Sequence, residues 1–311
     1  MSDAATKRRS WLEAVTSFAF SRAEALVAFV KQLDLVETVS VLTLFLAVVF
    51  AFPHWLTQIV VRICLFLFLL SPKIIRSPLF WLALSLSSTA VIIQDWHASD
   101  NHKYLLLYWL WVVFLCHFFR EPGQKRRTLL VNARFFLCFI FLAASAQKLS
   151  SPSYRSGEMF EYLLYVDTRF TAFGKLAGID PAVPEAVQKR ISFFRSPFSQ
   201  VTDNDLQLPG SDRARAVGLL STWWDLLIQL AMGMLFLFRR SITDQFAHIC
   251  LLLFIFTTYL LAPVFGFGWI LAIMGFTLAK ENFPRIATVY IISFVMILLY
   301  QLPWRDWVLA A

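Results

Sequence analysis

Long apolar stretches recur along almost the whole chain, and they constrain its fold more than any other feature. They lie at residues 38–52, 55–71, 78–94, 102–119, 128–148, 214–238, 245–262, 266–280 and 286–302. A membrane-spanning helix needs about 20 mostly apolar residues, and fewer where flanking residues reach the interface. The chain is 59% hydrophobic and 15% charged, whereas soluble proteins are about 25% charged. We therefore predict an all-α polytopic membrane protein, embedded in the lipid bilayer as a bundle of eight or nine transmembrane helices.

The count stays open because only Pro53 and His54 separate the first two stretches. These stretches form either two helices or one helix with a kink, since proline interrupts the hydrogen-bond ladder of a helix.

Basic residues in the short loops predict the orientation, because cytoplasmic loops carry the excess of Lys and Arg. They occur near the N-terminus and then in alternate loops, at Lys7, Arg8, Arg9, Lys73, Arg76, Arg120, Lys125, Arg126, Arg127, Arg239, Arg240, Lys280 and Arg285. The opposite loops carry Asp95 and Asp100 or no charge. We expect a cytoplasmic N-terminus in a bacterial inner or plasma membrane. The net charge of +8 is then a topology signal and indicates no nucleic-acid partner.

Two segments stand apart from the transmembrane domain, which we expect to cover residues 38–311. Residues 1–37 form a cytoplasmic or interfacial segment, in which 11–34 has the pattern of an amphipathic helix lying in the membrane interface. Residues 149–213 are too long for a simple connector. We expect them to form an extracytoplasmic helical cap, with short amphipathic helices at 159–170 and 184–194.

The four cysteines predict neither a metal site nor a disulfide framework. Cys64, Cys116, Cys138 and Cys250 lie inside apolar stretches and lack the spacing of metal ligands. We interpret them as buried structural thiols, because a free cysteine behaves as a small apolar residue.

Four ionisable residues within or beside the stretches need an explanation, because a charge at mid-bilayer costs about 2.5–3.5 kcal/mol on insertion scales. They are Lys148, His102, Asp225 and His248. Structural roles are open to all four: an interface lysine, a histidine among the headgroups, a paired carboxylate and a hydrogen bond between helices. We expect Asp225 to need a partner such as His248 or Arg62. We interpret Arg62 as a structural partner for a carboxylate or a carbonyl group.

The same residues lie in stretches that resemble the vitamin K-dependent gamma-glutamyl carboxylase. FLAASAQKLSSPSYRSGEMFEYL at 141–163 resembles its lysine motif, although Ser145 and Gln147 replace a glycine and a lysine. DNHKYL at 100–105 is similar to the start of a family span, and WDL at 224–226, followed by His248, has family-like spacing. The matches cover the core of the HTTM (horizontally transferred transmembrane) superfamily. The length suits its short bacterial branch, which resembles sporulation-delaying protein B.

The resemblance implies a chemistry. In the carboxylase, a lysine removes a proton from vitamin K hydroquinone, and oxygenation gives a strong base that abstracts a glutamyl proton before carbon dioxide is captured. Lys148 matches this base, His102 and His248 match supporting histidines, and Asp225 matches a motif carboxylate. Desolvation at an apolar boundary would favour the neutral amine that a base requires.

The short branch acts in maturation of secreted peptide toxins. The resemblance therefore implies modification or maturation of a secreted peptide precursor at a site toward the extracytoplasmic side. It also implies a reduced quinone of the vitamin K or menaquinone type and an accessory subunit as partner. The alternative is a non-enzymatic membrane factor for maturation or assembly of a peptide toxin.

Overall fold

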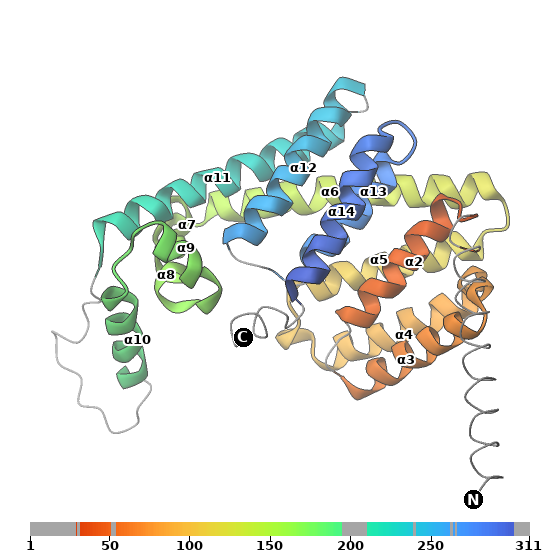
Figure 1. Cartoon of the computed structure of the whole chain (residues 1–311), viewed down its shortest axis with the longest axis horizontal. Helices are drawn as coiled ribbons and strands as arrows, with labels where there is room; N and C mark the ends of the chain where they lie inside the picture. Colours follow the sequence, from red (N-terminus) through yellow and green to blue (C-terminus); the bar gives the residue numbers. More distant parts are fainter. Residues whose placement is uncertain are drawn as a thin grey trace, which may run out of the picture. The chain divides into compact units, whose positions relative to one another are not determined.

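The computed structural model describes residues 29, 32–50, 54–194, 210–238, 241–261, 264 and 266–301, and all regular structure in these ranges is helical. The helices are α2 (Leu35–Val49), α3 (Trp55–Leu70), α4 (Pro78–Gln94), α5 (Asn101–Phe118), α6 (Pro122–Ser150), α7 (Pro152–Arg155), α8 (Glu158–Val166), α9 (Thr171–Leu176), α10 (Ala182–Phe194), α11 (Asp212–Leu237), α12 (Ser241–Leu261), α13 (Phe267–Ala279) and α14 (Pro284–Gln301) (Figure 1). Short 3-10 turns are η1 (Pro72–Arg76), η2 (Trp96–Ala98) and η3 (Thr168–Phe170). Each predicted apolar stretch forms a helix, which confirms the all-α class.

Three helices, α6, α11 and α12, are long and apolar enough to cross a membrane. Helices α2, α3, α4, α13 and α14 are apolar but shorter. Helix α5 belongs to neither group, because its first turn carries the polar sequence Asn-His-Lys-Tyr. These helices support a membrane protein.

The boundary between the first two stretches is a true interruption. The side chain of Asp34 caps α2 in a capping box with Glu37. His54 caps α3, since its Nδ1 accepts a hydrogen bond of 3.3 Å from the backbone N–H of Leu56. Because α3 has a cap of its own, α2 and α3 are two helices rather than one kinked helix.

Helix α6 begins at Pro122, several residues before the predicted stretch at 128–148. Proline is favoured in the first turn of a helix, and the basic residues that follow it are good helix formers.

Several predictions lie wholly or almost wholly outside the described residues. These are the interfacial helix at 11–34 and the basic clusters at 7–9 and 239–240.

The chain divides into two compact units, residues 1–132 and 133–311. In the first unit, a buried histidine that the sequence did not single out joins three helices. His117 Nε2 lies 2.8 Å from Ser40 Oγ, and its ring stacks on Trp81. The indole N–H of Trp109 also donates to Thr43, at 3.0 Å. These contacts hold α5 against α2 and α4.

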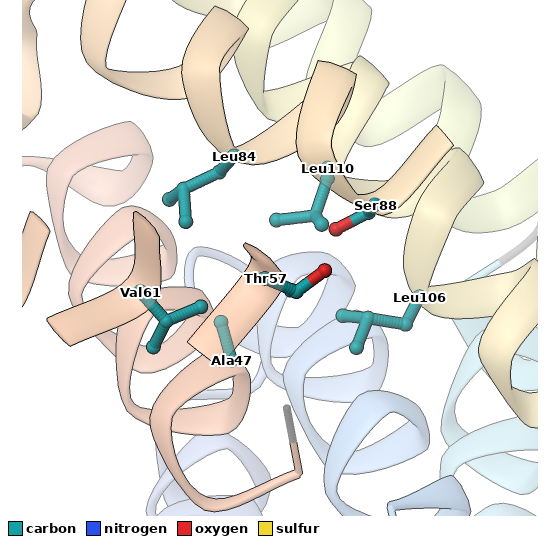
Figure 2. A pocket seen from close by; sticks show the side chains of 7 residues that line it. All are labelled: Ala47, Thr57, Val61, Leu84, Ser88, Leu106 and Leu110. Atoms are coloured by element: carbon teal, nitrogen blue, oxygen red, sulfur yellow. The ribbon is translucent and has the colours of Figure 1, made fainter. Parts of the chain in front are cut away.

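The first unit also contains a cavity between α2, α3, α4 and α5 (Figure 2). The hydroxyls of Thr57 and Ser88 reach it among apolar side chains, and Thr57 Oγ1 has no hydrogen-bond partner among the described residues. The cavity measures about 10 Å³, which corresponds to about one water molecule. It is therefore a packing feature of this unit and too small for a larger ligand.

In the second unit, the segment between α6 and α11 packs against the first turns of α11 around a shared hydrophobic core. This core comprises Leu164, Tyr165, Phe170, Ile179, Val187 and Ala214. Helix α8 and η3 cover the predicted helix at 159–170, and α10 covers the one at 184–194. The sequence did not predict α7 and α9. Residues 152–194 of this segment are thus helical and more than a connector.

Two glycines allow α8 to approach α11 closely, and the two helices lie side by side in Figure 1. Gly157 caps α8 with φ 84°, a left-handed conformation that favours glycine. A Cβ atom on Gly218 would lie 2.9 Å from both the backbone N of Glu161 and the carbonyl O of Gly157. The contact between these two backbones therefore requires a residue without a side chain, and it places α7 and α8 against α11.

Candidate functional site

Lys148 and Asp225 are in direct contact, although they lie far apart in the sequence. Lys148 is in the last turn of α6, and its Nζ donates a hydrogen bond to Asp225 Oδ2 on α11. Their side chains are 22% and 18% exposed. The prediction that Asp225 pairs with His248 or Arg62 is therefore wrong, because Lys148 is its partner. Arg62 is exposed and forms no ion pair with another described residue.

Gln229 connects the two charged groups, and sequence reasoning missed it. It follows Asp225 by four residues, so the two side chains share one face of α11. Gln229 Nε2 donates to Asp225 Oδ1 at 2.7 Å, while its Oε1 accepts from Lys148 Nζ at 2.9 Å. The amide thus closes a ring of hydrogen bonds. A polar residue one turn after a carboxylate in an apolar stretch was the available signal.

Tyr154 is the fourth member of the cluster, and it reaches Asp225 because the chain turns after α6. Pro152 cannot continue a helix, and Ser151 begins α7 by accepting a hydrogen bond of 3.3 Å from the backbone N–H of Tyr154. The phenol donates to Asp225 Oδ2, and its ring centre lies 5.3 Å from Lys148 Nζ. Burial, and then the Asp225 charge, raise the pKa of Tyr154 far above its usual range. The phenol therefore stays protonated as a donor.

These four residues, the Lys148 cluster, define what the site can do. Asp225 accepts hydrogen bonds from Lys148, Tyr154 and Gln229. An ammonium and a carboxylate in direct contact can exchange a proton, which converts the charged pair into a neutral amine and a carboxylic acid. The cluster is thus suited to proton transfer.

His248 lies elsewhere in the second unit. Its Nδ1 is 3.0 Å from the hydroxyl of Tyr290, and its ring meets Phe236 edge-on at 5.4 Å between centroids. Phe236 is three turns beyond Asp225 on α11, which is about 16 Å at a rise of about 1.5 Å per residue. The structure therefore does not bring His248 into the Lys148 cluster. Its contacts are those of a buried residue that joins helices.

His102 lies in the first turn of α5, in the first unit, whereas Lys148 and Asp225 belong to the second. Its side chain is 26% exposed, and its Nδ1 is 3.7 Å from Asp100 Oδ1. The role of His102 in a shared site stays a prediction.

A second ion pair in the same unit was missed by sequence reasoning. Arg134 on α6 donates to both carboxylate oxygens of Asp244 on α12, at 2.7 and 3.0 Å, and to the carbonyl oxygen of Phe236 at 3.0 Å. The signal was an arginine inside the apolar stretch at 128–148.

Comparison of the chain with protein-family models, with curated proteins and with solved structures found no match.

Proposed function

We propose that this chain is an integral membrane protein of the HTTM type that acts in modification or maturation of a secreted peptide. In this proposal it has nine transmembrane helices, because α2 and α3 are separate, and the α7–α10 segment is an extracytoplasmic cap. The contact between Lys148 and Asp225 carries the proposal. It joins two of the separate stretches that resemble family motifs, and it places a proton-transfer pair next to the cap segment through Tyr154.

Lys148 acts as the base in this proposal. Its hydrogen bonds go to Asp225 and Gln229, so its proton must first pass to Asp225. In that step an N–H bond breaks at Nζ and an O–H bond forms at Oδ2. The free amine then takes a proton from the substrate, while Tyr154 and Gln229 hold the Asp225 side chain in place.

The residues around the pair fit a reduced quinone of the vitamin K or menaquinone type. The hydroxyls of Ser145 and Thr222 are buried and have no hydrogen-bond partner among the described residues. Each lies one turn before Lys148 or Asp225, on the same helix face. Hydroxyl groups suit the two oxygens of a hydroquinone ring. When bound, the hydroquinone would supply the acidic O–H group whose proton Lys148 accepts.

The test uses the purified full chain with reduced menaquinone or vitamin K, oxygen and labelled bicarbonate. We expect epoxide of the quinone even without a peptide acceptor, and none with Lys148→Arg, which keeps the charge but cannot release a proton. If the wild-type chain forms no epoxide under conditions in which a known carboxylase is active, the quinone chemistry is excluded.

A non-enzymatic maturation factor is the second candidate, and one observation favours it. The side chains of the Lys148 cluster satisfy one another, so the pair would also serve as a clamp between α6, α7 and α11. A charge exchange separates the two functions. Lys148→Asp combined with Asp225→Lys keeps a clamp but moves the amine to α11. Peptide maturation retained in this double variant would support the clamp, and its loss, with the protein folded, would support the base.

A further inference from the structure

We infer that the segment between α6 and α11 carries a peptide-binding pocket, an inference that rests on the proposed action on a secreted peptide. A cavity of about 380 Å³ lies among α8, η3, α9 and α10. Ligand pockets in proteins measure about 300–1,000 Å³, so this one is at the small end. It has room for one or two amino-acid side chains with their main chain.

The floor of the pocket is apolar. Leu164 and Ile179 line it, and both are 5% exposed because they belong to the core of the segment. Pro181 and Pro184 add apolar surface. Gly174 also lines the pocket, and a Cβ atom there would meet only Ile179 Cδ1, at 3.8 Å. The pocket therefore suits an apolar side chain. A larger side chain at position 174 would fill it.

The rim offers the hydrogen bonds that a peptide main chain uses. Thr168 and Thr171 provide hydroxyl groups. Gln188 donates its amide N–H to the carbonyl oxygen of Tyr165 at 3.1 Å, which leaves Oε1 as an acceptor. A peptide presents an N–H donor and a C=O acceptor at each residue, so these groups match an extended segment.

Two opposite charges on the rim select the occupant further. Lys175 on α9 and Glu185 on α10 are exposed, and neither forms an ion pair with another described residue. The nearby carboxylate of Asp167 is already bound by Arg169. We therefore assign the pocket to a peptide segment with an apolar side chain between an acidic and a basic residue. A zwitterionic lipid headgroup would match both charges but would leave the apolar floor uncovered.

The experiment measures binding of fluorescent pentapeptides to the purified full chain by anisotropy. The probes are Glu-Gly-Leu-Gly-Lys and the reverse order Lys-Gly-Leu-Gly-Glu, with glycine replacing leucine as the control. We expect one order to bind and the loss of leucine to weaken it at least tenfold. Gly174→Leu should weaken binding similarly, because its side chain fills the pocket. The matched control is Ala172→Leu, at an exposed position of α9 that does not line the pocket.

Charge variants keep the inference testable if Gly174→Leu fails to fold. Lys175→Glu combined with Glu185→Lys should reverse the preferred order of the charged residues. Three results would each overturn the peptide pocket: unchanged binding in Gly174→Leu, an unchanged preference in the charge variant, or competition by glycerophosphoethanolamine that is stronger than competition by the peptides.

Lys148→Met should abolish epoxide formation and leave peptide binding unchanged. A failed pocket with intact epoxidation, or the reverse, therefore shows which of the two proposals is wrong.

Discussion

The second unit contains two ion pairs that connect α6 to a neighbouring helix, and they differ in chemistry more than in burial. The side chains of Arg134 and Asp244 are 19% and 15% exposed, and those of Lys148 and Asp225 are 22% and 18% exposed. Arg134 binds Asp244 through two parallel hydrogen bonds and also binds a backbone carbonyl. Lys148 instead shares its donors between a carboxylate and an amide, and Tyr154 donates to the same carboxylate.

The comparison separates a structural pair from one that can transfer a proton. A guanidinium keeps its proton in proteins, and its planar fork fixes the geometry of the carboxylate. An amine can release a proton, and Lys148 contacts a carboxylate able to receive it. Since the two pairs are similarly buried, the identity of the cation determines whether a pair can transfer a proton. Arg134–Asp244 is therefore an internal control for Lys148–Asp225.

The largest expected effect comes from exchanging the cations. Lys148→Arg should reduce quinone epoxidation at least about 100-fold, because general acid–base catalysis contributes about 10²–10⁴-fold. Arg134→Lys should change the rate only a few-fold, since it preserves a charge that transfers no proton. Both rates are measured on purified protein of equal thermal stability. Wild-type activity in Lys148→Arg would reduce Lys148 to an interface anchor and make the two pairs equivalent.

The next prediction concerns the sides of the membrane on which α6 begins and ends. In a chain whose four native cysteines are replaced by serine, Ser153→Cys should react with an impermeant thiol reagent in intact cells. Gln124→Cys should react only after the cells are opened. Both positions are exposed in the structure. Labelling of Gln124→Cys alone would invert the topology and move the Lys148 cluster to the cytoplasmic side.

The sequence predicted the helices well and their partners poorly. Apolar stretches of sufficient length allow little besides helices in a bilayer, so each predicted stretch forms a helix. Which faces meet depends on tertiary packing, and the pair Lys148–Asp225 spans 77 residues of sequence. The resemblance singled out both residues but did not pair them. Tyr154 was hidden because its position depends on the turn at Ser151 and Pro152. His248 was grouped with Asp225, although its ring contacts Phe236, about three turns along α11 from Asp225.

The third prediction measures what the structural pair contributes. Arg134→Met leaves the carboxylate of Asp244 without its partner. Breaking a fully buried pair in this way costs about 3–5 kcal/mol, so this partly buried pair should lose less. Replacing both residues, with Arg134→Met and Asp244→Leu, should recover most of this loss because no uncompensated charge remains. The free energy of unfolding is measured in one detergent for all variants. A double variant no more stable than Arg134→Met would show that shape, rather than charge, determines the effect.

The smallest expected effect tests whether the Lys148 cluster depends on the close contact between α8 and α11. Gly218→Ala places a Cβ 2.9 Å from backbone atoms at Gly157 and Glu161, and these cannot move as a flexible side chain can. Overpacking of this kind typically costs about 1–3 kcal/mol. Displacement of α8 should also pull Tyr154 away from Asp225, so epoxidation should fall while Arg134–Asp244 remains intact.

Gly174→Ala is the matched control, because its Cβ meets nothing closer than 3.8 Å. Alanine in a helix is favoured over glycine by about 1 kcal/mol, so this variant should be slightly more stable than the wild type and keep its activity. If Gly218→Ala lowers stability and epoxidation while Gly174→Ala lowers neither, the α8–α11 contact supports the cluster through Tyr154. If both variants keep full activity, Lys148 and Asp225 function without the tyrosine, and the cluster reduces to the pair and Gln229.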